Sequence, residues 1–221
     1  MMKWFYAPAA LVALSAGSIL AEDYRVEAFK DVPAPKGVSA DVAAQLSTSG
    51  FKVLEGDKRV VCEIWPAKTW TAKADFEPSD TILYALEPGS LVGVLRFPRK
   101  GADFRGQEIA AGAYTLRYGD QPVDGNHVGT FDTRDFLLLL PAGADESTAA
   151  LPEAELFEKS AQAAGSTHPA IWPLVKPAGD GAKPTLRHIE EKEWWTVCFG
   201  GQDAGGKKLA LELIVVGKAA E

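Results

Sequence analysis

The sequence lacks the short motifs by which many enzymes are recognised. It has only two cysteines and three histidines. No stretch fits the common motifs of serine hydrolases, zinc proteases, dithiol proteins, dinucleotide-binding folds or phosphate-binding loops. A site assembled from distant residues would leave no such trace, so the enzyme question stays open. The absences nevertheless favour a protein that is not an enzyme.

Long apolar runs are absent after the first residues. Lys3 precedes an uncharged, mostly apolar segment that ends at Ala21, just before two acidic residues. This order predicts a secretory signal peptide over residues 1–21, and an uncleaved anchor is the alternative. No later run is long enough to span a membrane after signal cleavage. We therefore expect a periplasmic or secreted protein.

The chain has fewer basic than acidic side chains. The 30 Asp and Glu side chains outnumber the 23 Lys and Arg side chains, which gives a formal net charge of −7. An acidic exported protein is poorly suited to bind nucleic acid or an anionic membrane surface. A small molecule or an envelope protein is therefore the partner that we expect.

The two cysteines allow at most one disulfide. Export favours a bridge between Cys62 and Cys198. Strand alternation argues against it, because Cys62 falls on the apolar face of its strand, whereas Cys198 alternates with the apolar Val197 and Phe199. A bridge and two separately packed thiols both remain open.

Short strands dominate the chain that follows the predicted signal. Apolar alternation and short apolar runs, bounded by turn residues, predict strands over residues 51–54, 59–65, 80–86, 91–97, 114–118, 136–140, 186–189, 193–199 and 208–216. The strand at 114–118 is expected to pair antiparallel with the strand at 91–97, because the connection is too short and polar for a covering helix.

Helical signals are few. Pro152 at a first turn, acidic residues after it and Gly165 at the exit predict a helix over Pro152–Ala164. A short helix is predicted within residues 39–49, in an N-terminal extension that covers residues 22–50. Three prolines between residues 169 and 177 predict an extended segment without regular structure. Together these patterns predict an all-β fold, an antiparallel, jelly-roll-like β-sandwich over residues 51–221 with one or two short helices.

Residues 119–134 form the longest segment without a clear period. Loops longer than about 12–15 residues are uncommon in compact domains and are often functional. This loop is polar and joins two of the clearest strands, so we predict a ligand-binding site formed by Asp124, Asn126, His127, Asp132 and Arg134. The alternative is a long hairpin loop whose carboxylates are simply solvated and bind no ligand.

Two of the three histidines lie in irregular segments. His127 and His168, with Asp124 or Asp132, would suit a divalent ion such as zinc, copper or iron. Their spacing does not show that they meet, and the alternative is that each imidazole hydrogen-bonds within its own loop. A divalent metal is the one cofactor that the sequence suggests, and the cofactor is otherwise unknown.

One strand carries a family resemblance. The block AAGAYTLRY, with Gly112, Tyr114, Thr115 and Leu116, resembles the A-G-x-Y-T-L strand of a family of exported bacterial β-sandwich proteins of unknown function. The resemblance implies the fold and export, and it supplies no reaction or catalytic residue.

Three functional hypotheses follow from these patterns. The first is an exported, non-catalytic β-sandwich module that binds a small ligand or an envelope partner through residues 119–134. The second is a metal-binding protein or metalloenzyme that uses His127 and His168. The third is a structural subunit of an envelope assembly.

Overall fold

A computed structural model describes residues 24–123 and 131–219. Its elements in chain order are β1 (Tyr24–Phe29), α1 (Ala40–Gln45), β2 (Gly50–Glu55), β3 (Arg59–Pro66), β4 (Leu91–Phe97), β5 (Gly101–Ala102), β6 (Glu108–Ile109), β7 (Gly112–Asp120), β8 (Asp135–Pro141), α2 (Glu153–Ala164), β9 (Ile171–Val175), β10 (Thr185–Ile189), the short 3-10 helix Glu190–Lys192, β11 (Trp194–Gln202) and β12 (Lys208–Val216). The predicted signal peptide lies outside the described residues.

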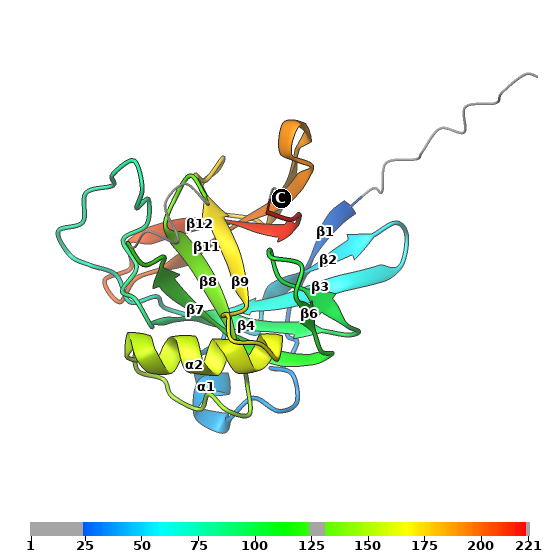
Figure 1. The fold of residues 1–221 in the computed structure, drawn as a ribbon, viewed down its shortest axis with the longest axis horizontal. Helices are drawn as coiled ribbons and strands as arrows, with labels where there is room; N and C mark the ends of the chain where they lie inside the picture. The colour runs from blue at the N-terminus through cyan, green and yellow to red at the C-terminus, as the bar shows by residue number, and fades with distance from the viewer. Residues whose placement is uncertain (1–23, 124–130, 220–221) are drawn as a thin grey trace, which may run out of the picture.

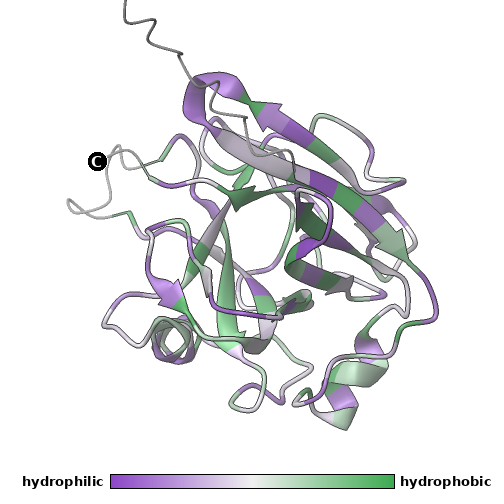
Figure 2. Ribbon diagram, turned by 90° about the vertical axis from the view of Figure 1, so that its right-hand side faces the viewer, coloured by the Kyte–Doolittle hydropathy of each residue, from purple (hydrophilic) through white to green (hydrophobic). Residues whose placement is uncertain are grey.

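The strands confirm an all-β antiparallel fold. Ten of them form one sheet in the order β1-β2-β3-β4-β7-β8-β9-β12-β11-β10, and β5 pairs with β6 as a separate hairpin. The sheet curls until its two edge strands, β1 and β10, contact each other (Figure 1). The result is a nearly closed barrel, visible as a ring of strands in Figure 2, rather than the two packed sheets of a jelly roll.

The interior of the barrel holds the main core. Alternate residues of β12, Leu211, Leu213 and Val215, point into this core, and Val197 and Phe199 of β11 face them. Cys198 is also buried but lies outside the main core cluster, whereas Cys62 lies within it. Both thiols are free.

Helix α2 covers the outside of β8. Leu156 packs with Leu138 and Leu140 in a smaller core (Figure 1). The helix begins after Pro152 and ends at Gly165, whose φ of 59° is left-handed and whose N–H donates to the carbonyls of the last turn. The predicted helix over Pro152–Ala164 is therefore confirmed, with Pro152 as its cap.

The segment that follows β1 covers a second outer surface. Ser39 caps α1 by accepting from the N–H of Val42. Val42 and Leu46 then pack against Trp65 and Val94. Since β1 is itself a strand of the sheet, residues 24–50 contribute both a strand and a helix to this unit. Within the described ranges, neither helix has the length and apolar character needed to cross a bilayer.

Two predictions about regular structure are wrong. Residues 80–86 form no strand, because their backbone groups bond elsewhere: the N–H of Leu83 donates to the carboxylate of Asp135. Conversely, residues 171–175 form β9 despite Pro173. Pro173 lies opposite Phe136 of β8, and the pairing of β9 with β12 begins only after it, so the missing N–H of proline interrupts no bond on the β12 side.

Candidate ligand-binding site

A large cavity lies where β9 and β12 separate. Its volume is about 880 Å³, and we call it the side pocket. The apolar residues that line it are Tyr24, Val60, Val61, Phe97, Phe104, Trp172, Ile214, Val215 and Val216. They come from β1, β3, β4, β9, β12 and the β5–β6 hairpin, so elements distant in sequence meet around one hollow.

A short ladder opens this part of the barrel. Strands β9 and β12 pair only through Leu174 with Leu213 and Val175 with Glu212. Beyond these pairs the strands diverge, and the β5–β6 hairpin bridges the space. The N–H of Phe104 donates to the carbonyl of Ile171 at 3.0 Å, and the carbonyl of Phe104 accepts from Ala219 at 2.9 Å. The hairpin therefore forms one wall of the side pocket.

Two β-bulges turn additional side chains toward the cavity. In β3, Val60 pairs with Leu54 while Cys62 pairs with the adjacent Val53, which leaves Val61 as the extra residue. A bulge re-aims side chains that simple alternation would send to opposite faces. Both Val60 and Val61 consequently line the side pocket.

The second bulge lies in β12. Ile214 pairs with Thr196 while Val216 pairs with the adjacent Trp195, so Val215 is the extra residue. Ile214, Val215 and Val216 all line the side pocket. Bulges of this kind are concentrated at barrel rims and beside functional sites. Two strands thus lose their regular alternation at the same cavity.

A rigid aromatic pair forms the floor. The rings of Phe97 and Trp172 meet edge to face, with centroids 5.7 Å apart and planes at 84°. Each residue is 2% exposed. The indole N–H of Trp172 donates to the carbonyl of Ala102 at 3.2 Å, which fixes the ring. The floor is therefore formed in advance of any ligand.

Charged side chains surround the opening. The cations are Arg59, Arg99, Lys100, Lys192 and Lys218, and the carboxylates are Glu55, Asp103 and Glu193. Three cations already have partners: Arg59 bonds Glu55 at 2.7 Å, Lys100 bonds Glu108 at 2.6 Å and Lys192 bonds Asp132 at 2.8 Å. Among residues 24–123 and 131–219, Arg99 and Lys218 have no carboxylate partner.

One carboxylate of the wall is buried and satisfied. Asp103 is 2% exposed and accepts from the backbone N–H groups of Arg105 and Gln107 at 3.0 and 2.8 Å. Its other oxygen accepts from the side-chain amide of Gln107 at 2.8 Å. These bonds hold the β5–β6 hairpin in shape, so Asp103 is a structural residue of the wall.

The loop predicted to bind ligand is described only in part. Asp124, Asn126 and His127 lie outside the described residues. Asp132 is exposed and pairs with Lys192, and Nε of Arg134 donates to the carbonyl of Gln121 at 2.7 Å. Neither of these two lines the side pocket. Asp132 therefore lies at the rim, where it pairs with Lys192, whereas Arg134 lies at the base of its own loop.

Aromatic contacts attach the returning half of that loop to the outside of the barrel. Phe131 stacks on Trp194 with centroids 5.5 Å apart, and both contact Phe104. Phe104 lines the side pocket on its other side. The loop is therefore a neighbour of the side pocket, although its described residues do not enter it.

Of the two histidines in the metal hypothesis, His168 lies within the described residues and His127 lies outside them. His168 is exposed, and its backbone N–H donates to Ser166 just before β9. The loop that contains His127 returns to the barrel at Thr133, whose hydroxyl donates to the carbonyl of Leu174. Leu174 lies near the opposite end of β9 from His168. In the described part of the chain, no group of three His, Cys, Asp or Glu side chains is arranged to hold a metal. A site involving His127 stays a prediction.

Sequence reasoning missed the side pocket, although a signal was present. Val60-Val61 and Ile214-Val215-Val216 place apolar residues side by side near strand ends, where strict alternation fails. Such breaks are typical of bulges. Arg99 follows the end of β4 by two residues, and Lys218 follows the end of β12 by two residues.

The comparisons with known proteins add no relative. No family model, no curated protein and no solved structure matches the chain. The resemblance of the β7 block to an exported family stays a prediction, and functional argument rests on the geometry of the chain itself.

Proposed function

We propose that this protein is an exported, non-catalytic module that binds a small, largely apolar molecule in the side pocket. The observation that carries this proposal is the pair of bulges in β3 and β12, which turn Val61 and Val215 toward one preformed apolar cavity. A regular barrel would have closed this region with alternating side chains.

The size of the cavity supports a small molecule. Ligand pockets typically enclose about 300–1,000 Å³ and are lined mainly by apolar and aromatic side chains with a few polar groups. The side pocket, at about 880 Å³ with an aromatic floor, has these properties.

The polar groups support binding rather than chemistry. The described residues that line the side pocket include no histidine, cysteine, serine or threonine. Two of its three carboxylates are engaged: Glu55 pairs with Arg59, and Asp103 accepts hydrogen bonds from its own hairpin. Glu193 is exposed at the rim, with its carboxylate 3.5 Å from Nε2 of His188. Nucleophilic catalysis requires a nucleophile next to a base that activates it, and this lining supplies no such pair.

The loop of residues 119–134 fits the same proposal as a neighbouring surface. Asp132 holds Lys192 at the rim, and Phe131 packs against Phe104 in the wall. An envelope partner that contacted this loop would therefore touch the rim of the ligand pocket. The small ligand is the primary proposal because the cavity has a preformed aromatic floor of Phe97 and Trp172.

A fluorescence titration with the neutral probe phenylnaphthylamine tests the proposal. We expect saturable binding of one probe per chain. Val61→Trp fills the cavity and should weaken binding at least about tenfold, which corresponds to about 1.4 kcal/mol. Thr48→Trp adds the same ring at an exposed position away from the cavity and should leave binding unchanged. Equal binding by both variants, or no binding by the parent protein, would overturn the proposal.

A further inference from the structure

The charges at the opening indicate which apolar molecule fits. We infer, resting on the proposed function of the side pocket, that its ligand is an amphipathic anion whose acidic group lies near Arg99 and Lys218. Five cations and three carboxylates line the pocket of a chain whose formal net charge is −7. The local excess of positive charge therefore opposes the sign of the whole molecule.

The two unpaired cations carry the inference. Arg59, Lys100 and Lys192 are each within hydrogen-bonding distance of a carboxylate. Arg99 and Lys218 are exposed and have no such partner within the described part of the chain. A bound anion would give these two side chains the counter-charge that residues 24–123 and 131–219 do not provide.

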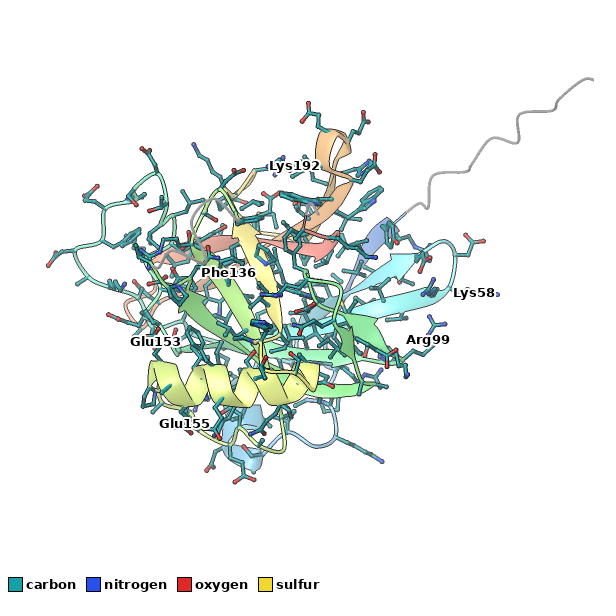
Figure 3. The ribbon with its side chains drawn as sticks, in the orientation of Figure 1. Lys58, Arg99, Phe136, Glu153, Glu155 and Lys192 are labelled. Carbon is teal, nitrogen blue, oxygen red and sulfur yellow. The ribbon has the colours of Figure 1, made fainter. Side chains whose placement is uncertain are left out.

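Their positions relate the charged group to the apolar floor. Arg99 follows Phe97 of β4 by two residues, and Lys218 follows the bulged end of β12 by two residues. Both therefore extend from strands that build the floor or wall. Figure 3 shows Arg99 on the side of the molecule that carries Lys58, whereas Glu153 and Glu155 of α2 lie on another side. An anion held at this rim would direct its apolar part toward Phe97 and Trp172.

The remaining groups argue against a cationic or a fully polar ligand. An ammonium group would meet Arg99 and Lys218, while Asp103 and Glu55 are engaged in internal bonds and Glu193 is the one exposed carboxylate among the described lining residues. A bare inorganic anion would leave the aromatic floor without a contact. A molecule with one acidic group and an apolar or aromatic body uses both halves of the site, so carboxylates and sulfonates of this kind are the predicted class.

A matched pair of probes separates this inference from the proposed function. Anilinonaphthalene sulfonate carries an acidic group on nearly the same aromatic body as the neutral phenylnaphthylamine. We expect the sulfonate to bind at least about tenfold more tightly at low salt, and this advantage should shrink as salt screens the exposed cations. The double variant Arg99→Gln, Lys218→Gln should remove most of the advantage, measured as the ratio of the Kd values of the two probes.

Arg105→Gln with Lys183→Gln is the matched control, because both side chains are exposed, carry the same charges and lie outside the lining of the side pocket. This control should keep the preference for the sulfonate. If both probes bind equally, or if the control loses as much as the double variant, the anion inference is wrong while the pocket proposal stands. If neither probe binds, the proposed function fails and the inference fails with it.

Discussion

Val61 and Val215 line the same cavity because each is the extra residue of a β-bulge, one in β3 and the other in β12. The register of β4 against β7 also shifts, at Val92, but that residue does not line the side pocket. Two of these three irregularities therefore coincide with the side pocket. Irregular strands at a cavity wall are the structural basis of the proposed binding function.

Ligand binding at this site should stabilise the fold. A ligand that binds only the native state at a concentration of 100 Kd adds about 2.7 kcal/mol to the free energy of unfolding. For a chain of this length, that corresponds to a rise in Tm of about 5–10 °C. A thermal melt with and without anilinonaphthalene sulfonate measures it, and a tenfold weaker affinity in Val61→Trp should lower the gain to about 1.4 kcal/mol and so halve the rise. A Tm that is unchanged or lowered at saturation would place the probe on unfolded protein.

Breaking the buried pair of Arg117 and Asp145, which lies outside the side pocket, should strongly destabilise the protein. Both side chains are fully buried, and Arg117 also donates to the carbonyls of Gly89 and Ala149 at 2.6 and 2.8 Å. Asp145→Ala would leave the guanidinium buried without its counter-charge, so we expect a loss of about 3–5 kcal/mol. Urea unfolding measures this loss.

Replacing both partners, Arg117→Met with Asp145→Leu, is the informative companion to that variant. Removing both charges avoids the unpaired ion, so the double variant should be more stable than Asp145→Ala alone. A single variant that loses less than about 1 kcal/mol would show that water reaches the guanidinium and that the pair behaves as a surface ion pair.

Asp135 should make the protein less stable as the pH rises. Burial raises the pKa of the Asp135 carboxyl, and hydrogen bonds from Tyr118 and Leu83 only partly oppose this. The Tyr118 hydroxyl has a single proton but lies 2.6 Å from Asp135 and 2.8 Å from Asp120. A proton on one of the two carboxyls completes this network.

The sign of the effect follows from linkage. Because the folded pKa lies above the ordinary value of 3.8, the folded state holds the proton more tightly. Asp135 therefore contributes full stability below that value, and the contribution is lost as the pH rises through the raised pKa. Each unit by which the pKa is raised is equivalent to about 1.4 kcal/mol.

Asp135→Asn should flatten this dependence and stabilise the protein at neutral pH. The amide can accept from Leu83 and donate to Tyr118 without a charge. Chemical unfolding across the acidic to neutral range provides the measurement. A steeper fall in the variant than in the parent protein would contradict the raised pKa.

Both cysteines should be reduced and protected. Cys62 and Cys198 are buried free thiols, and burial raises the pKa of each. The thiolate is the reactive form, so native protein should react very slowly with a maleimide at neutral pH. Unfolding without a reductant should expose two reactive thiols per chain. Detection of none after unfolding would demonstrate a bridge.

Most of the strands were predictable from local sequence because their apolar residues either alternate or form short runs bounded by turn residues. The predicted segments 91–97 and 208–216 coincide with β4 and β12, and the predicted antiparallel pairing of β4 with β7 is confirmed. The strand predicted over residues 80–86 is wrong because the apolar pattern around Leu83 reflects burial of side chains. Backbone groups of this segment bond to the carboxylate of Asp135 and to the N–H of Arg134 and do not form a strand ladder. Periodicity does not report where backbone hydrogen bonds go.

The side pocket was not predictable from local pattern alone. It depends on the length of the β9–β12 ladder and on bulges whose partners are distant in sequence. One part of its wall does have a local signal. In the β5–β6 hairpin, Asp103 and Gly106 make the same turn bonds as Asp203 and Gly206 between β11 and β12, with φ of 78° and 83° at the two glycines. The shared pattern G-x-D-x-x-G identifies both hairpins.

A crystal structure of the protein with anilinonaphthalene sulfonate tests the central claim most directly. The account predicts one probe in the side pocket, with its rings between Phe97, Trp172 and Val215 and its sulfonate within hydrogen-bonding distance of Arg99 or Lys218. A probe bound elsewhere on the protein while the side pocket stays closed by its own side chains would contradict it.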